Sequence, residues 1–282
     1  MLLPPSTPWL WSRQSRVFHV VSRGVRTNTH LRRGGGGSGG GSRNRQGFSG
    51  GNFGGIPPYL WVSAAATGGI ITVGYFAFLN EAPLTKRRRW IATSPEWESR
   101  LGDEQYKQLR QQYRGQILDP QHRASRTVGR VGSRIAEAAR SFCSEHSLQH
   151  VVSSKPYTFT VVRSDEANAF VLPGNHVFVL AGLFRHVRSE DELAAVLGHE
   201  AAHTLARHAG ERMSGGIVVN TLAQLLFLLD PSGIMTTLFL PAVNLLSTLP
   251  HSREAESEAD QIGLYLASKA CYDPRAAKRV FQ

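Results

Sequence analysis

The sequence predicts a mostly helical α+β body of about 190 residues that follows one transmembrane helix. Residues 59–79 carry no charge, later segments repeat apolar residues three or four positions apart, and two short apolar segments have the pattern of strands. The charge divides at the same place, because residues 1–90 hold 12 Lys and Arg against one acidic residue, whereas residues 91–282 hold 20 of each kind. The net charge of +11 therefore belongs to the first third alone, which excludes a uniformly basic nucleic-acid-binding body.

The first 33 residues are typical of a mitochondrial targeting leader. The first acidic residue is Glu81, and arginines recur among Ser, Val and Leu before residue 34. Cationic segments free of acidic residues direct import into mitochondria. A secretory signal fits less well, because prolines interrupt the short apolar stretch near residues 8–10. A disordered basic tail is the alternative interpretation.

Residues 34–55 predict a flexible linker, because 12 of the 28 glycines lie there. The neighbouring Arg32 and Arg33 raise the alternative of an RNA-binding segment. That alternative is weak, since the segment has no RGG repeat and only Phe48 and Phe53 offer rings for stacking. We therefore expect no nucleic-acid partner.

Residues 59–79 predict a single transmembrane helix, and hence an integral, single-pass membrane protein. The 21 uncharged residues would extend ~30 Å as a helix, which matches the hydrocarbon core of a bilayer. Aromatic residues lie near both ends, and the basic run Lys86–Arg89 follows. By the loop-charge rule, this basic run would keep the body on the matrix side.

The body begins with elements that follow from periodicity and turn signals. Two helices and two strands are predicted, namely helices at 96–116 and 122–148 and strands at 157–162 and 176–180. A further helix begins at Ser189, with Glu192 completing a capping box.

The helix that begins at Ser189 contains the motif His199-Glu200-Ala201-Ala202-His203. Two histidines one turn apart lie on one helical face, so both rings can bind a single zinc ion at ~2.0–2.1 Å. The helix is otherwise apolar around the motif, and a buried polar cluster needs a partner. The motif predicts a zinc site with Glu200 as the catalytic residue.

Zinc needs a third protein ligand. His208 would lie on the opposite face of a continuous helix, at about 100° per residue, and is predicted to be structural. Glu256 is the better candidate, and Asp260, one turn later, can accept the N–H of a ligating histidine.

The remaining polar residues near the site receive simpler interpretations. Glu254 and Glu258 are predicted to be solvated residues at a helix N-terminus. Cys143 and Cys271 lack the spacing of a zinc or redox pair; at most they form one disulfide bridge, and we expect both to be buried thiols.

Residues 216–249 carry one charge, Asp230, and predict a helical hairpin. The halves 217–229 and 234–249 are each short for a membrane span, and residues 230–233 form a turn between them. We expect the hairpin to pack on the body or to enter the membrane surface. A hairpin embedded in the membrane is the alternative interpretation.

The motif H-E-x-x-H followed by S-R-x-x-E-x-E-A-D resembles the zinc endopeptidases related to bacterial HtpX and the CAAX prenyl protease. With the leader and the membrane helix, the chain is most similar to the mitochondrial inner-membrane branch of that family, whose activity overlaps that of the m-AAA protease. The resemblance covers about residues 168–282 and implies a zincin-like metallopeptidase domain at 91–282. It implies one Zn²⁺ per chain on His199, His203 and Glu256.

The resemblance also implies roles for residues outside the metal site. The N-A-F and P-G-x-x-V segments look like the strand that pairs with substrate backbone, which makes Asn168, Gly174 and Val177 candidate substrate-binding residues. His251 and Arg253 are candidates for stabilising the oxyanion.

The implied function is an endopeptidase that cuts inner-membrane proteins in quality control and under stress, including a dynamin-like fusion GTPase. The resemblance places the catalytic domain in the intermembrane space, against the loop-charge rule. Family members continue beyond the third-ligand helix, so we expect a domain truncated at its C-terminus. A catalytically silent, zinc-stabilised membrane scaffold is the alternative function, and a homo-oligomer is a candidate assembly.

Overall fold

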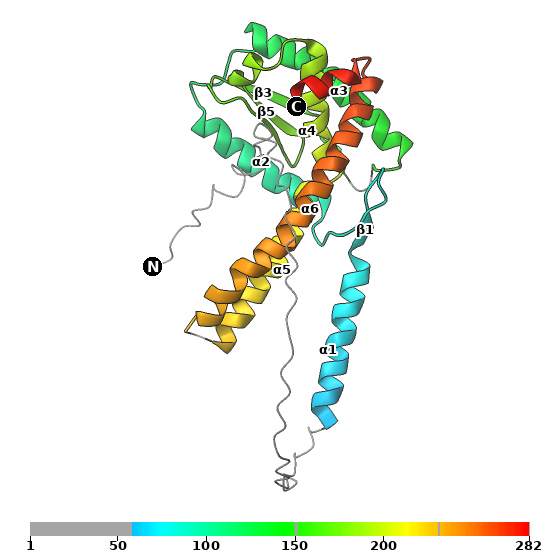
Figure 1. Cartoon of the computed structure of the whole chain (residues 1–282), viewed down its shortest axis with the longest axis vertical. Helices are drawn as coiled ribbons and strands as arrows, with labels where there is room; N and C mark the ends of the chain where they lie inside the picture. Colours follow the sequence, from blue (N-terminus) through cyan, green and yellow to red (C-terminus); the bar gives the residue numbers. More distant parts are fainter. Residues whose placement is uncertain (1–57, 150–151, 231, 282) are drawn as a thin grey trace, which may run out of the picture. The chain divides into compact units, whose positions relative to one another are not determined.

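The computed structural model describes residues 58–149, 152–230 and 232–281, and these residues form two compact units. One unit contributes the helix α1 (Pro58–Ala77), and all elements from β1 onward belong to the other unit, which we call the body (Figure 1). The predicted leader at 1–33 and linker at 34–55 lie outside the described residues.

Helix α1 lies where the sequence predicts a transmembrane helix, although it ends two residues before residue 79. Its described side chains include exposed apolar residues such as Val73 and Phe76. Within the described ranges, the structure contains no helix with the length and apolar composition that crossing a membrane requires. The predicted helix is present, but its role as a membrane span is not confirmed.

The body begins with an antiparallel hairpin that the sequence analysis did not predict. Its strands are β1 (Leu79–Glu81) and β2 (Arg88–Trp90), and we call residues 79–90 the entry hairpin. Arg87 and Arg89 of this hairpin have only 15% and 4% of their side chains exposed, and both form ion pairs with Glu211 and Glu258. Half of the basic run is therefore neutralised inside the body, which weakens the loop-charge argument for a matrix orientation.

Two long helices follow at the predicted positions. They are α2 (Pro95–Gln112) and α3 (Arg123–Glu145). Helix α2 begins at Pro95 because the Ser94 side chain accepts a hydrogen bond from the N–H of Trp97. The His122 side chain accepts from the N–H of Ala124 and caps α3 in the same way. Helix α3 buries one apolar stripe, as its spacing predicts.

A three-stranded sheet in the described part of the body has the order β3-β5-β4. Its strands are β3 (Thr158–Val162), β4 (Ala169–Leu172) and β5 (His176–Leu180). Strands β3 and β5 are parallel, whereas β4 pairs antiparallel with β5. The two predicted strands are confirmed, and β5 is the central, fully buried one. Strand β4 is therefore an edge strand of this sheet.

Helix α4 (Glu190–Leu205) lies at the centre of the body and packs against β4, α3, α6 and α7. Ser189 caps it, because its side chain accepts from the N–H of Glu192, while the Glu192 carboxylate accepts from the N–H of Arg188. Most of its residues are buried, which is why its apolar pattern surrounds the helix instead of following one face.

Helix α4 ends at Leu205. From the sequence, we expected a continuous helix that extends past this residue. Arg207 adopts a left-handed conformation with φ 53°, and α5 (His208–Leu229) begins directly after it. Helix α5 and helix α6 (Ile234–Lys269) then form the predicted hairpin. Its described part exposes large apolar side chains, namely Ile217, Val218, Leu225, Phe227, Leu228 and Ile234.

The described chain ends with the turn η2 (Pro274–Ala276) and the short helix α7 (Ala277–Val280). Both cysteines are free: Cys143 is half-buried, whereas Cys271, at the end of α6, is exposed. The prediction of two buried thiols is therefore wrong for Cys271.

Helices α4 and α6 approach closely because glycines meet at their crossing. A Cβ atom on Gly263 would lie 2.9 Å from both N and Cα of His199, and one on Gly198 would lie 2.9 Å from the carbonyl oxygen of Gly263. Side chains that are at most 1% exposed surround this contact, among them Leu197, Ala259 and Ile262.

We expect Gly263→Ala to lower the free energy of unfolding by about 1–3 kcal/mol, because the added methyl group meets backbone atoms that cannot move aside locally. Gly129→Ala on α3 is the matched control, since a Cβ there meets nothing within 4 Å and alanine favours a helix by up to ~1 kcal/mol. Urea unfolding measures both changes. Equal stability of the two variants would contradict the close crossing.

Candidate metal centre

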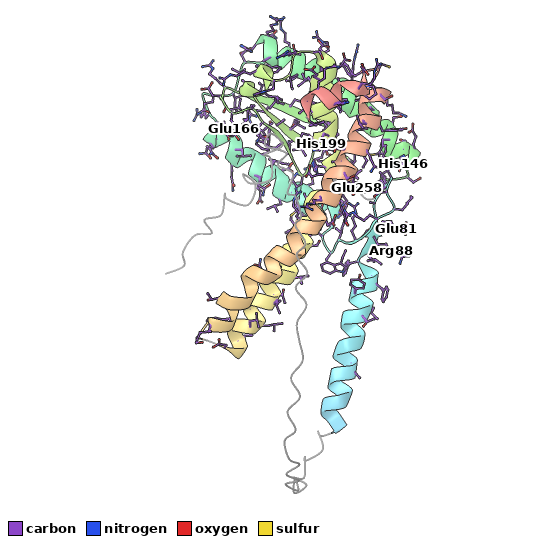
Figure 2. The ribbon with its side chains drawn as sticks, viewed as in Figure 1. Glu81, Arg88, His146, Glu166, His199 and Glu258 are labelled. Carbon is purple, nitrogen blue, oxygen red and sulfur yellow. The ribbon has the colours of Figure 1, made fainter. Side chains whose placement is uncertain are left out.

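Three side chains from α4 and α6 converge where these helices pack together. The Nε2 atoms of His199 and His203 lie 3.2 Å apart, and Oε2 of Glu256 lies 3.3 Å from the first and 3.8 Å from the second. Within the described ranges these three residues form a group with the spacing of metal ligands. Figure 2 labels His199 on α4 and, on the adjoining stretch of α6, Glu258.

The three ligand atoms fit a zinc ion in both chemistry and spacing. The circle through them has a radius of about 2.0 Å. Zinc binds histidine nitrogen and carboxylate oxygen at ~2.0–2.2 Å, so these three atoms are close enough together to hold one cation. Two histidines and one glutamate leave the fourth tetrahedral position open, which is typical of a catalytic site.

Asp260 orients the first histidine from the side away from the ligand triangle. Its Oδ1 atom lies 2.9 Å from Nδ1 of His199. The Nδ1–H therefore donates to the carboxylate, which leaves Nε2 free to bind a cation. The geometry matches the role that the sequence analysis gave to Asp260.

His208 contacts the second histidine; it is structural, as the sequence predicts, but it does not lie on the opposite face. The Nδ1 atoms of His203 and His208 lie 2.8 Å apart. A continuous helix would have placed His208 on the opposite face, but the left-handed Arg207 ends α4 and turns His208 back toward the site. Arg207 is itself buried and donates to Glu98 of α2 and to the carbonyl oxygen of Thr93.

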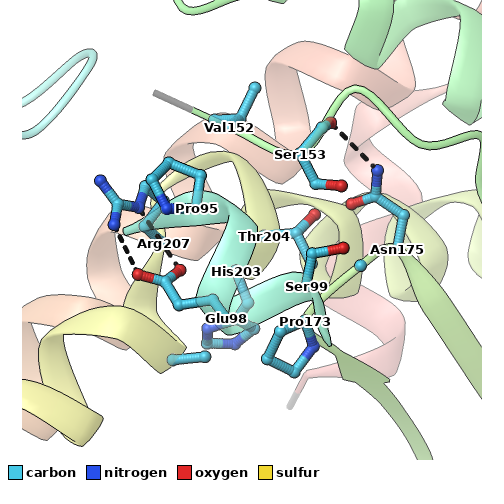
Figure 3. Close-up of a pocket in the computed structure, with 12 residues that line it drawn as sticks. Pro95, Glu98, Ser99, Val152, Ser153, Pro173, Asn175, His203, Thr204 and Arg207 are labelled. Atoms are coloured by element: carbon cyan, nitrogen blue, oxygen red, sulfur yellow. Dashed lines mark hydrogen bonds and ion pairs between the residues drawn. The ribbon is translucent and has the colours of Figure 1, made fainter. Parts of the chain in front are cut away.

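A small pocket lies at this junction between α4 and α5. Its lining includes His203, Thr204 and Arg207 together with Glu98 and Ser99 of α2, and its volume is about 20 Å³ (Figure 3). The pocket is too small for a peptide side chain. The ion pair between Arg207 and Glu98 that borders it fixes the helix break.

Glu258 is buried, although the sequence predicted a solvated residue. It is 1% exposed and lies in the middle of α6, not at a helix N-terminus. Its Oε2 atom lies 3.0 Å from Nε2 of His208. Burial alone would raise the pKa of Glu258, but hydrogen bonds from His208 and Thr85 outweigh burial and hold it at about 2. Glu254, whose side chain is 55% exposed, matches the solvated prediction.

The surroundings give the two histidines opposite pKa shifts. Burial lowers the pKa of His199, but hydrogen bonds to Asp260 and Glu256 outweigh it and raise the pKa to about 10. Burial and the charge of His199 hold the pKa of His203 well below its usual value. The carboxylates around His199 therefore favour a positive charge at the centre of the site.

Glu200 lies between the two histidines on α4 and contacts the sheet. Its carboxylate lies near the backbone N–H of Val171 on β4, which acts to lower its pKa. Burial raises its pKa to about 7, and the negative charge of Glu256 adds to this effect. A carboxylate with a pKa near neutrality can take up and release a proton, which is what a general base requires.

The candidate substrate-binding residues do not converge on the site. Val177 is 1% exposed on the central strand β5, so it belongs to the core and is not available to a substrate. Gly174 has φ 85° in the turn between β4 and β5, against Ser99 of α2. The carbonyl oxygen of Asn168 accepts from the N–H of Leu180 within the sheet. Asn168 and Gly174 lie at the two ends of strand β4, and their role in substrate binding stays a prediction.

The candidate oxyanion residues are not brought to the ligand triangle by any described contact. Arg253 is exposed on α6, and the His251 side chain lies outside the described side chains. Arg212 of α5 is a further charged residue near the site, and its charge interacts with Glu256 and Glu200. No sequence motif marks Arg212, because its position depends on the break at Arg207.

A buried H-E-x-x-H helix, a glutamate from a second helix and an edge strand beside the catalytic carboxylate together define the class of zinc metallopeptidases. Comparison with known families is more specific. The chain belongs to peptidase family M48, whose pattern matches residues 129–281.

The chain is similar to curated proteins with mitochondrial names. It is 36% identical to the mitochondrial metalloendopeptidase OMA1 of Schizosaccharomyces pombe over 79% of this chain and 62% of that protein. It is 33% identical to the protein of the same name in Saccharomyces cerevisiae, over 74% of this chain and 59% of that protein. The mitochondrial metalloendopeptidase OMA1 of Bos taurus is 30% identical over 79% of this chain and 43% of that protein. The chain thus spans less than two thirds of the length of these relatives.

We expect Glu256→Gln to weaken zinc binding more than tenfold, because an amide oxygen carries no net charge to offset that of the cation. Glu190→Gln at the start of α4, whose partner is Arg130, is the control and should bind zinc as the unchanged protein does. Competition with a chromophoric chelator gives the affinities. Unchanged zinc affinity of Glu256→Gln would exclude Glu256 as a ligand.

Proposed function

We propose that this protein is a zinc-dependent endopeptidase of the mitochondrial inner membrane that hydrolyses peptide bonds of membrane proteins. The observation that carries the proposal is the triangle of His199, His203 and Glu256, with the Glu200 carboxylate beside it. Membership in peptidase family M48 supports this chemistry.

His199, His203 and Glu256 would hold the zinc ion, with Asp260 fixing the ring of His199. Bound zinc would supply Lewis acidity, polarising the scissile carbonyl and lowering the pKa of water. Glu200 accepts a proton from the attacking water and delivers it to the leaving amine, which needs a carboxylate whose pKa lies near neutrality.

Strand β4 is suited to hold the substrate backbone. Because the N–H of Leu180 donates to the carbonyl oxygen of Asn168, alternation along β4 turns the backbone groups of Ala169 and Val171 away from β5. An extended peptide can add to this edge as a further strand. The contact between Val171 and Glu200 places the edge next to the catalytic carboxylate, so pairing positions a peptide bond for hydrolysis.

The location in the proposal follows from the sequence and from the relatives. The cationic leader and the names of the relatives favour mitochondria. Helix α1 would be the single membrane anchor, and the apolar α5–α6 hairpin would contact the membrane. We place the body in the intermembrane space, since burial of Arg87 and Arg89 removes much of the charge that favours the matrix. We also propose that the protein forms a homo-oligomer.

We expect Glu200→Gln to retain zinc and to lose hydrolysis of an unfolded protein such as casein by at least about a hundredfold, because the amide cannot accept the proton. His203→Ala should lose both zinc and hydrolysis. Glu190→Gln, an exposed change at the start of the same helix, should retain both. Zinc content and cleavage measured on one preparation decide the matter. Equal cleavage by Glu200→Gln and the unchanged protein would overturn the catalytic role, and zinc without cleavage in the unchanged protein would favour the silent scaffold.

Protease treatment of mitochondria and mitoplasts tests the location. We expect the body to be protected in intact mitochondria and degraded once the outer membrane is opened. A body that stays protected in mitoplasts, while a known intermembrane-space protein is degraded, would place it in the matrix.

A further inference from the structure

A continuous chain of buried and partly buried hydrogen bonds leads from His203 to the entry hairpin. Nδ1 of His203 contacts Nδ1 of His208 at 2.8 Å, and Nε2 of His208 contacts Oε2 of Glu258 at 3.0 Å. The Thr85 hydroxyl donates to Oε1 of Glu258 at 2.6 Å, and Nη2 of Arg87 donates to Oε2 at 3.3 Å. We call these five residues the relay.

The direction of each bond in the relay follows from the ligand role of His203. The Nε2 atom of His203 is one of the three ligand atoms and must lack a proton to bind a cation. Nδ1 of His203 is therefore protonated and donates a hydrogen bond to Nδ1 of His208. Nε2 of His208 is then protonated and donates a hydrogen bond to the carboxylate of Glu258. Each polar atom of the relay acts either as a donor or as an acceptor, and His208 is neutral in this arrangement.

Burial makes these bonds expensive to lose. His208 and Glu258 are each 1% exposed, so water cannot replace a missing partner. Glu258 is held on a second side by the entry hairpin, whose Arg87 also binds Glu211 of α5 through two bonds of 2.7 Å. Arg89 of the same hairpin donates to the carbonyl oxygen of Ala206, where α4 ends. The hairpin thus contacts both the end of α4 and the start of α5.

The two histidine ligands are therefore oriented in different ways. His199 has a carboxylate as its direct partner, and the side chain of Asp260 is 54% exposed. The direct partner of His203 is the neutral His208. The nearest carboxylate on that side is Glu258, which contacts His208 and is held in place by Thr85 and Arg87. The sequence separation between Thr85 and Glu258 is 173 residues, so the relay forms only in the folded body.

We propose that His208 and Glu258 are positioning residues that orient His203 for zinc, and that the entry hairpin sets this orientation through Thr85 and Arg87. The segment directly after α1 thereby controls the affinity of the metal centre. This inference rests on the proposed zinc site and goes beyond it, because it assigns a role to residues that touch neither metal nor substrate.

Zinc affinity of the full-length chain, measured by chelator competition, tests the relay. We expect His208→Phe to weaken zinc binding by about ten- to a hundredfold, the usual effect of losing an outer hydrogen bond to a ligand. His208→Gln should stay within about threefold, since its amide can both accept from His203 and donate to Glu258. Glu258→Gln should weaken binding by about tenfold.

The hairpin arm is tested by Thr85→Val, which removes one hydroxyl at an exposed position and keeps the side-chain shape. We expect zinc affinity to fall by about threefold or more. Glu192→Gln is the matched control for Glu258→Gln, because Glu192 is also buried on a helix with an arginine partner but does not contact the relay. It should bind zinc normally.

A second readout separates orientation from general loss of stability. With Co²⁺ in place of zinc, the visible absorption bands report ligand geometry, and we expect them to shift in His208→Phe and Glu258→Gln at saturating Co²⁺ but not in Glu192→Gln. Unchanged affinities in His208→Phe and Glu258→Gln, or equal loss in Glu192→Gln, would overturn the proposal. An unchanged Thr85→Val would overturn the role of the hairpin. If the unchanged protein bound no zinc, the proposed zinc site itself would fail, which is a separate outcome.

Discussion

The crossing of α4 and α6 at Gly198 and Gly263 is the constraint on which the site depends. Gly263 lies within van der Waals contact of the His199 backbone, and any side chain there would push the helices apart. Glu256, Asp260 and Gly263 are spaced four and three residues apart, so they share one face of α6. The same close contact that packs the core therefore carries the third ligand and the partner of His199 to the histidine pair, and the centre exists only at this separation.

The polar groups around the ligands have one common task, which is to fix where two imidazole rings point. Asp260 does this for His199, and His208 with Glu258 does it for His203. Buried charges are costly, and each of these is paired or hydrogen-bonded. This layer also connects distant parts of the sequence, since the entry hairpin, the start of α5 and the middle of α6 meet at Glu258. Metal affinity, stability of the body and the position of the entry hairpin are consequently linked.

The sequence predicted what depends on local geometry and missed what depends on distant contacts. The spacing within H-E-x-x-H and between Glu256 and Asp260 follows from helical periodicity alone. The predicted position of His208 on the opposite face was wrong because periodicity presumes an unbroken helix, and an arginine gives no sign in the sequence of the positive φ of Arg207. The assignment of Glu258 failed because its partners are distant in sequence: His208 lies 50 residues away, Arg87 171 and Thr85 173. Val177 shows a third limit, since a matching motif does not reveal which strand of a sheet is the edge.

The most direct measurement of the central claim is zinc-edge X-ray absorption on the full-length chain purified with its native metal. The account predicts one zinc per chain with four nitrogen and oxygen neighbours at ~2.0–2.1 Å, and outer-shell scattering from two imidazole rings. Sulfur in the first shell would implicate Cys143 or Cys271 instead, and a single imidazole would remove His199 or His203 from the site. Either result, or a protein without bound metal, would contradict the centre described above.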